Sequence, residues 1–152
     1  MEVFHIAREK YSADISGEGA RLYGGRWNKK GVGLVYTSKN ASLAALEVLA
    51  HVSSASFPVD YMLVTISIPN NASIEVLNLN ELPSNWRTYP GPQALAELGT
   101  EWLLSKRSLL LEVPSALVET EKNLLINPYH PEMGTVMVKE QKRFNFDERL
   151  AK

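Results

Sequence analysis

Short apolar runs, each ended by a turn-forming residue, are the main pattern along the chain, and they predict a protein rich in β-strands. Runs of Val, Ile, Leu, Phe and Tyr bounded by Gly, Pro, Asn or Ser are typical of strands. Runs of this kind lie at residues 3–7, 33–37, 61–68, 73–77 and 108–113. Near the C-terminus, residues 135–139 and 143–146 predict a hairpin.

Two longer apolar segments predict helices. Residues 40–52 are rich in Ala, Leu and Val, and Ser38 or Asn40 can cap the N-terminus of this helix. Residues 93–104 follow a turn rich in proline and glycine and predict the second helix. Because the strands outnumber the helices and do not alternate with them strictly, the predicted fold class is α+β, with a mixed β-sheet core flanked by helices.

The composition is that of a globular protein, and it excludes several functional classes. Hydrophobic residues make up 45% of the chain, and 16 basic residues against 17 acidic ones give a net charge of −1. This balance argues against binding to nucleic acid through bulk charge. The absence of cysteine excludes disulfides, thiol catalysis and Cys-ligated metals. We expect residues 1–152 to form one soluble, cytoplasmic domain, because the sequence shows neither a membrane-length apolar run nor a secretion signal.

Six of the nine glycines lie between residues 17 and 33, which predicts a folded loop there and not a regular helix. This segment carries a local charge of +3, which favours an anionic ligand. Neither the dinucleotide-binding fingerprint nor the P-loop motif is present. Arg26, in the turn GGRWN, has a guanidinium suited to a phosphate or a carboxylate. The structural alternative is that Trp27 fills the core while Arg26 pairs with an acid such as Glu47.

The segment 40–52 predicts a buried helix, because its apolar residues cover the whole helix circumference. Glu47 lies in its middle, and a carboxylate in such surroundings needs a partner, hydrogen bonds or a cavity. It is either a carboxylate of a functional site or a structural group, paired with an arginine or reaching water at a helix edge. His51 lies one turn later and can share the face of Glu47. A metal site formed by Glu47 and His51 together with His5 and His130 is a weaker alternative, since the HExxH signature is absent.

Two further polar positions can contribute to a site. Ser115 comes directly after a predicted strand, but no nucleophile elbow surrounds it. Its hydroxyl can still donate a hydrogen bond to a ligand. Asn127 begins a loop made rigid by Pro128 and Pro131, and such a loop either forms a wall of a site or only connects two elements.

Several blocks of the sequence closely resemble the RES-domain family, which is named for an Arg, a Glu and a Ser. They are residues 16–28 (SGEGARLYGGRWN), 35–38 (VYTS) and 46–51 (LEVLAH). The likeness continues through Leu82-Pro83, Trp86, Gly99, Trp102, Val113-Pro114-Ser115, Asn123, Asn127-Pro128 and His130-Pro131, and ends at Phe146-Asp147 and Arg149-Leu150. The matched blocks follow one another in order and cover nearly the whole chain.

This resemblance implies a toxin of a bacterial toxin–antitoxin pair, with a fold similar to that of ADP-ribosyltransferases. Members of the family consume NAD+ as phosphorylases or glycohydrolases, and some ADP-ribosylate a protein. NAD+ is then a substrate and no cofactor is implied, with inorganic phosphate as co-substrate in a phosphorylase. The implied partner is a small helix-turn-helix antitoxin of the Xre type that covers the active site. We expect a homo-oligomer or a hetero-oligomer with the antitoxin, and no direct nucleic-acid or membrane partner.

The resemblance also implies roles for individual residues. Arg26 would hold the diphosphate or the attacking phosphate, Tyr36 would stack on the nicotinamide ring, and Glu47 would stabilise the cation that forms at the ribose. These three residues are the expected catalytic set. The expected substrate-binding residues are His5, Gly25, Asn28, Ser115 and Asn127, and no metal is expected. His5 stands where many relatives carry an arginine and could replace one of its contacts.

Two alternatives to an NAD+-degrading enzyme stay open at this point. The same residues could serve a protein ADP-ribosyltransferase, because cleavage of the nicotinamide–ribose bond is the first step of both reactions. The chain could also be a non-catalytic binding module, in which Glu47 and Arg26 form a purely structural pair and the toxin-like shell binds only its antitoxin.

Overall fold

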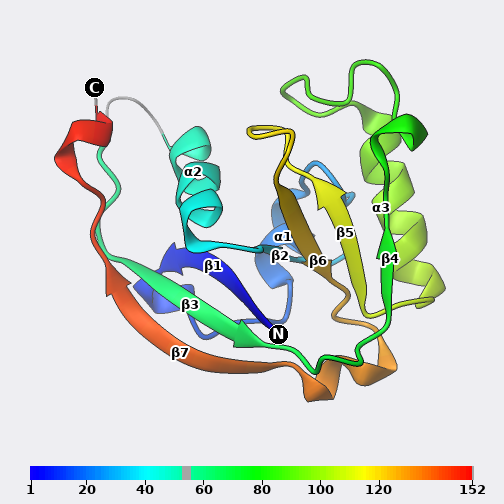
Figure 1. The fold of residues 1–152 in the computed structure, drawn as a ribbon, viewed down its shortest axis with the longest axis horizontal. Coiled ribbons are helices and arrows are strands. Elements are labelled where there is room, and N and C mark those ends of the chain that lie inside the picture. The colour runs from blue at the N-terminus through cyan, green and yellow to red at the C-terminus, as the bar shows by residue number, and fades with distance from the viewer. Residues whose placement is uncertain (53–55, 152) are drawn as a thin grey trace.

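One seven-stranded sheet is the centre of the fold in the computed structural model, which describes residues 1–52 and 56–151 (Figure 1). The strands are β1 (Glu2–Arg8), β2 (Val35–Ser38), β3 (Tyr61–Ser67), β4 (Ile74–Val76), β5 (Leu110–Pro114), β6 (Lys122–Ile126) and β7 (Met137–Phe144). The helices are α1 (Glu18–Tyr23), α2 (Ala41–His51) and α3 (Gln93–Ser105), with 3-10 turns η1 (Glu9–Tyr11), η2 (Leu79–Glu81), η3 (Pro131–Thr135) and η4 (Glu148–Ala151).

The sheet is mixed, as the order of elements predicted. Its strand order is β4-β5-β6-β2-β1-β3-β7. β4 runs parallel to β5, whereas the other neighbouring strands are antiparallel. The α+β fold class is therefore confirmed, and so are the strands expected near residues 3–7, 33–37, 61–68, 73–77 and 108–113 and both predicted helices.

Three details of the predicted fold are wrong. Residues 18–23 form the short helix α1 inside the segment expected to be irregular. The predicted C-terminal hairpin is instead the single strand β7, which pairs along its length with β3. Strand β6 had no predicted counterpart, although it lies inside the sheet between β5 and β2. For β6 and β7, pairing with strands distant in sequence determines the structure, and a local pattern does not contain it.

The sheet divides into two halves, because β1 and β2 pair through one residue pair, Phe4 with Ser38. One apolar cluster takes residues from both halves, among them Val3, Val35 and Val64, and forms the core between them. Two other clusters lie under the helices. One includes Trp102 from α3, and the other includes Ala44 from α2. The helices α2 and α3 thus cover separate parts of the fold, as Figure 1 also shows.

Helix α2 is less buried than its all-round apolar sequence predicted. Leu43 and Ala44 are its buried residues, whereas Leu46 is 43% exposed and the helix ends with an exposed His51. Asn40 caps the N-terminus, as expected, because its Oδ1 accepts the backbone N–H of Leu43 at 2.8 Å. The helix therefore presents one side to the sheet and leaves the rest open.

Candidate active site

The carboxylate of Glu47 projects from α2 toward polar side chains at the ends of two inner strands of the sheet. Its Oε1 accepts a hydrogen bond from Nδ2 of Asn123 at 2.8 Å and one from Oγ of Ser115 at 3.2 Å. Asn123 belongs to β6, and Ser115 directly follows β5. Two strand ends thus hold one carboxylate oxygen. Within residues 1–52 and 56–151, the other oxygen, Oε2, has no hydrogen bond.

Both donors to Glu47 are themselves fixed in orientation. The completely buried hydroxyl of Ser115 accepts the backbone N–H groups of Leu117 and Val118 at 3.1 and 3.2 Å. Its own proton is therefore left for Glu47. The Oδ1 of Asn123 accepts a hydrogen bond from the hydroxyl of Ser38 at 2.7 Å, which turns the amide nitrogen toward Glu47. A carboxylate held this way is preorganised, because its donors do not need to rotate to keep it in place.

The segment that precedes α3 holds the side chain of Arg26. Its Nη1 donates to the backbone carbonyl of Trp86 at 2.7 Å. A Cβ added at Gly91 would lie 3.1 Å from both Cγ and Nη1 of Arg26, so the backbone there packs directly on the arginine. Burial lowers the pKa of the guanidinium, an effect that the charge of Glu47 partly offsets. Arg26 therefore stays cationic and close enough to Glu47 for the two charges to interact.

Arg26 and Glu47 do not form the structural ion pair that the sequence left open. No carboxylate among the described residues lies within 4.0 Å of the Arg26 nitrogens. In the same part of the chain, every buried polar side-chain atom has a hydrogen-bond partner. The guanidinium nitrogens without a partner are therefore open to solvent. Among the described residues, the Arg26 guanidinium and the Glu47 carboxylate thus each keep atoms without a partner, and the two charges are near enough to interact, which suits a ligand with both anionic and cationic parts.

Tyr36 fastens the glycine-rich loop to β2. Its hydroxyl donates to Oδ1 of Asn28 at 2.7 Å and accepts the backbone N–H of Trp27 at 3.0 Å. Burial raises the pKa of Tyr36 and keeps the phenol neutral. A Cβ at Gly25 would lie 2.6 Å from the same hydroxyl, so only glycine fits there. The hydroxyl is thus occupied by structural bonds, and the expected stacking role could involve only the ring.

Asn28 stabilises the loop from inside. It is 1% exposed, and its Nδ2 donates to the carbonyls of Ala20 and Val32, both at 2.8 Å. These bonds join α1 to the segment that leads into β2. The predicted substrate-binding residue Asn28 therefore supports the turn that carries Arg26, with its amide turned into the protein.

The substitution Asn28→Ala is expected to lower the free energy of unfolding by about 2–3 kcal/mol, since it removes the buried side-chain bonds to the carbonyls of Ala20 and Val32 and the acceptor of the Tyr36 O–H. Urea denaturation followed by circular dichroism measures the change. Asn145→Ala, at an exposed position, is the matched control and should stay close to the parent protein. Equal unfolding midpoints for the two variants would contradict the role given to Asn28.

Two other predicted binding residues do not meet Glu47. His5 alternates along β1 with Phe4 and Ile6, which pack in the cluster under α2, so it projects from the opposite face of the strand. Burial lowers the pKa of His5, and a hydrogen bond with the backbone of Tyr36 acts in the opposite direction. Asn127 is completely buried, and its Nδ2 donates to the carbonyl of Leu103 at 2.9 Å.

The histidine next to Glu47 has a local role. Nδ1 of His51 lies 2.8 Å from the backbone carbonyl of Glu47, so this nitrogen carries the proton and donates to the helix end. His51 therefore hydrogen-bonds within its own helix. No group of three His, Cys, Asp or Glu that could hold a metal ion occurs within the described residues. In that same part of the chain, no helix has the length and apolar character to cross a membrane.

The sequence did not identify all residues of this cluster. Asn123 and Trp86 lie in blocks that match the family, but no site role was expected for them. Ser38 was missed as a site residue as well. The one usable signal was Asn123, a polar residue at the start of the apolar run 124–126. The contribution of Trp86 is a backbone carbonyl, which no side-chain pattern can indicate.

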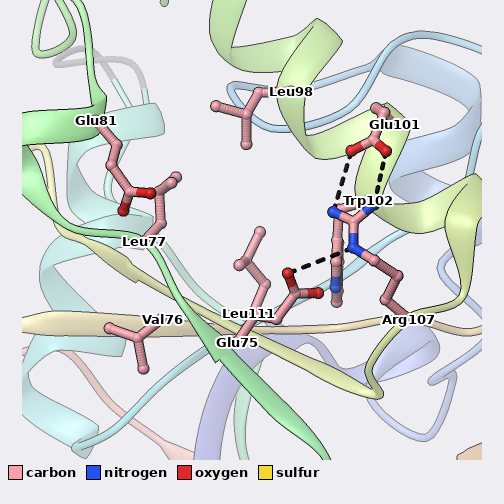
Figure 2. Close-up of a pocket in the computed structure, with 9 residues that line it drawn as sticks. All are labelled: Glu75, Val76, Leu77, Glu81, Leu98, Glu101, Trp102, Arg107 and Leu111. Atoms are coloured by element: carbon pink, nitrogen blue, oxygen red, sulfur yellow. Dashed lines mark hydrogen bonds and ion pairs between the residues drawn. The ribbon is translucent and has the colours of Figure 1, made fainter.

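A separate pocket of about 340 Å³ lies between β4 and α3 (Figure 2). Its lining residues are Glu75, Val76, Leu77, Glu81, Leu98, Glu101, Trp102, Arg107 and Leu111. Figure 2 shows Arg107 bound to Glu101 and Glu75, and the shortest of these ion pairs measures 2.6 Å. The only arginine in the pocket is thus neutralised by the pocket's own acids. The pocket contains none of the residues around Glu47 and Arg26.

Comparison with known proteins follows the whole chain. A family model described as the RES domain matches residues 2–147. A protein named Toxin Res from Yersinia enterocolitica serotype O:8 / biotype 1B (strain NCTC 13174 / 8081) is 42% identical over 152 residues, which is 99% of each chain. A protein named Prs ADP-ribosylating toxin from Sphingobium sp. (strain YBL2) is 38% identical over 146 residues, covering 95% of this chain and 91% of the relative.

A solved structure shares the fold. It is the crystal structure of the M. tuberculosis MbcT-MbcA toxin–antitoxin complex, which matches with a TM-score of 0.76. The alignment covers 95% of this chain and 84% of the other, at 20% sequence identity. At that identity the likeness establishes the arrangement of strands and helices, and it leaves the chemistry to the residues themselves.

Proposed function

The chain belongs to the RES domain family of toxins, and from this membership and the geometry around Glu47 we propose that it degrades NAD+ by cleaving the bond between nicotinamide and ribose. The observation that carries this proposal is the Glu47 carboxylate. Ser115 and Asn123 hold one of its oxygens, and the other has no partner within the described residues. A fixed anion open on one side is the group that this bond cleavage requires.

Cleavage of the nicotinamide–ribose bond develops positive charge on the ribose as the bond breaks. The electron pair of the bond leaves with nicotinamide, which becomes neutral. Glu47 stabilises the cation because its charge is already in place and its donors do not reorganise. The partly apolar surroundings strengthen this interaction relative to water. In the phosphorylase case, an oxygen of inorganic phosphate then forms the new bond to the ribose and yields ADP-ribose 1″-phosphate.

Arg26 is proposed to bind the anionic part of the substrate. Its open nitrogens offer a planar set of donors that suits a diphosphate or an attacking phosphate. The contacts with Trp86 and Gly91 fix the side chain from one side. Arg26 and Glu47 then hold the diphosphate and the reacting ribose of one NAD+ molecule at the same time, which places the substrate for reaction.

Incubation of the purified protein with NAD+, with and without phosphate, tests the proposed function. Release of nicotinamide in both conditions supports hydrolysis, and release of ADP-ribose 1″-phosphate only with phosphate supports phosphorolysis. No release of nicotinamide in either condition would contradict the proposal. If expression of the chain nevertheless arrested the growth of a bacterial host, the arrest would have to come from another activity.

A protein ADP-ribosyltransferase is the second candidate, and the relative named Prs ADP-ribosylating toxin supports it. The first step and the residues around it are the same as for degradation. The acceptor differs, because a protein side chain replaces water or phosphate. Radiolabelled NAD+ in a bacterial lysate distinguishes the two: label retained on a protein band favours transfer, and label only in small products favours degradation.

We propose that a small helix-turn-helix antitoxin of the Xre type is the partner and that it covers the space between Glu47 and Arg26. The structural neighbour with the same fold is a toxin in a complex with its antitoxin, and this supports such a partner. Co-expression with a neighbouring helix-turn-helix gene product should give a stable complex that releases no nicotinamide. A complex with unchanged activity would contradict coverage of the site.

Arg26→Lys is expected to lower kcat/KM for NAD+ by about tenfold or more, since lysine keeps the charge but loses the planar set of donors. Steady-state nicotinamide release measures the effect. The control is Arg21→Lys in the neighbouring helix α1, where the half-exposed arginine is already paired with Glu18 at 2.6 Å. A tenfold loss in both variants would indicate general loop damage and contradict a specific role for Arg26.

A further inference from the structure

An exposed tyrosine lies close both to Arg26 and to α2, the helix that carries Glu47. Tyr89 is 79% exposed, although it lies in the same segment as Trp86 and Gly91, which hold Arg26. Tyr89 is also close enough to Arg26 for the two groups to interact electrostatically. A large ring left in water beside an arginine with open donors is available to a ligand.

The ring of Tyr89 is held in position by α2. Its centroid lies 6.0 Å from that of His51, with the two ring planes at 90°, which is a favourable edge-to-face arrangement. His51 is itself fixed by its bond to the carbonyl of Glu47. In Figure 1 the segment between η2 and α3 extends toward α2. The contact between the Tyr89 and His51 rings joins this segment to the helix. Tyr89 is thus oriented by the helix that carries Glu47.

We infer that Tyr89 is a further substrate-binding residue and that its ring stacks on the adenine of the dinucleotide, an inference that rests on the proposed function. The reacting ribose must lie at Glu47, and the diphosphate lies at Arg26. The remaining part of NAD+ is the adenosine, which continues from the diphosphate toward the outer edge of the site. Tyr89 is the exposed aromatic residue at that edge. Stacking needs only a planar face, and an exposed phenol supplies one.

The decisive experiment compares Tyr89→Ala, Tyr89→Phe and the control Tyr11→Ala in steady-state nicotinamide release. Tyr11 is also exposed, at 57%, but lies in η1. We expect Tyr89→Ala to raise KM for NAD+ about tenfold with little change in kcat, because stacking contributes equally before and during bond cleavage. Tyr89→Phe keeps the ring and should behave as the parent protein, as should Tyr11→Ala.

A binding measurement separates stacking from a structural effect. In the Glu47→Gln background, calorimetry should show the same tenfold weaker NAD+ binding for Tyr89→Ala, whereas nicotinamide mononucleotide, which lacks the adenosine, should bind equally with and without the tyrosine. A lower kcat at constant KM, or equal losses for both nucleotides, would assign Tyr89 to the positioning of Arg26 and overturn the inference. Parent-like KM and binding in Tyr89→Ala would also overturn it.

The parent protein distinguishes failure of this inference from failure of the proposed function. If the parent releases nicotinamide and Tyr89→Ala is unchanged, only the role of Tyr89 is wrong. If the parent neither binds NAD+ nor releases nicotinamide, the proposed function is wrong, and the inference falls with it.

Discussion

Glu47→Gln is expected to lower the rate of nicotinamide release by at least about 100-fold, the size of effect that follows removal of one preorganised electrostatic contact with a transition state. Glutamine keeps the shape of the side chain and can still accept the hydrogen bonds from Ser115 and Asn123 through its amide oxygen. It removes the negative charge that would stabilise the ribose cation. The fold and NAD+ binding should therefore change little, and kcat should fall much more than KM changes.

The measurement is single-turnover or steady-state release of nicotinamide, with thermal unfolding as a check on folding. Glu97→Gln is the matched control, because Glu97 is an exposed glutamate in the middle of another helix, α3. It should have the activity of the parent protein. A folded Glu47→Gln variant with the parent rate would remove Glu47 from the reaction. If the parent itself had no turnover, the non-catalytic binding module would become the better account.

Much of the fold was predictable because it depends on local patterns. The run 61–68 bounded by Pro69 gave β3, and the polar Asn40 before an Ala- and Leu-rich segment gave the start of α2. The terminal hairpin failed because residues 137–144 find a better partner in β3 than in each other. Strand pairing at a separation of about 75 residues has no signature in the strand itself.

The candidate site was predictable in part. Glu47 and Arg26 were identifiable from chemistry, since a carboxylate in an apolar helix and an arginine in a glycine turn each need an explanation. Their surroundings were not. Ser115 and Asn123 meet Glu47 across 68 and 76 positions of the chain, and only the fold brings them together. Asn28 shows why the sequence alone does not assign a role, because a polar residue beside Arg26 can bond inside the protein as well as toward a ligand.

The position of Arg26 depends on a close contact between the glycine-rich loop and α3. Gly99 in α3 lies directly against the backbone of Trp27, and a Cβ added there would be 1.8 Å from the Trp27 carbonyl oxygen. One residue further, the hydroxyl of Thr100 accepts the backbone N–H of Lys29 at 3.0 Å. The loop is thus fixed on both sides of Asn28 by one turn of helix. Any shift of α3 at this point moves the turn that carries Arg26.

Gly99→Ala is therefore expected to destabilise the protein by about 3 kcal/mol, at the upper end of the usual cost of overpacking. The added Cβ is fixed to the helix backbone and the Trp27 carbonyl belongs to the loop backbone, so neither group can rotate away from the other. Alanine favours a helix over glycine by about 1 kcal/mol, so the clash must exceed this gain. For a chain of this size, the thermal midpoint should fall by about 6–12 °C. The control is Gly19→Ala in α1, where a Cβ meets no atom of the described residues within 4 Å and the thermal midpoint should stay or rise.

The clash displaces the loop that carries Arg26 as well. Nicotinamide release by Gly99→Ala should therefore fall even at temperatures where the variant is folded. A variant with parent stability and activity would show that α3 does not position Arg26.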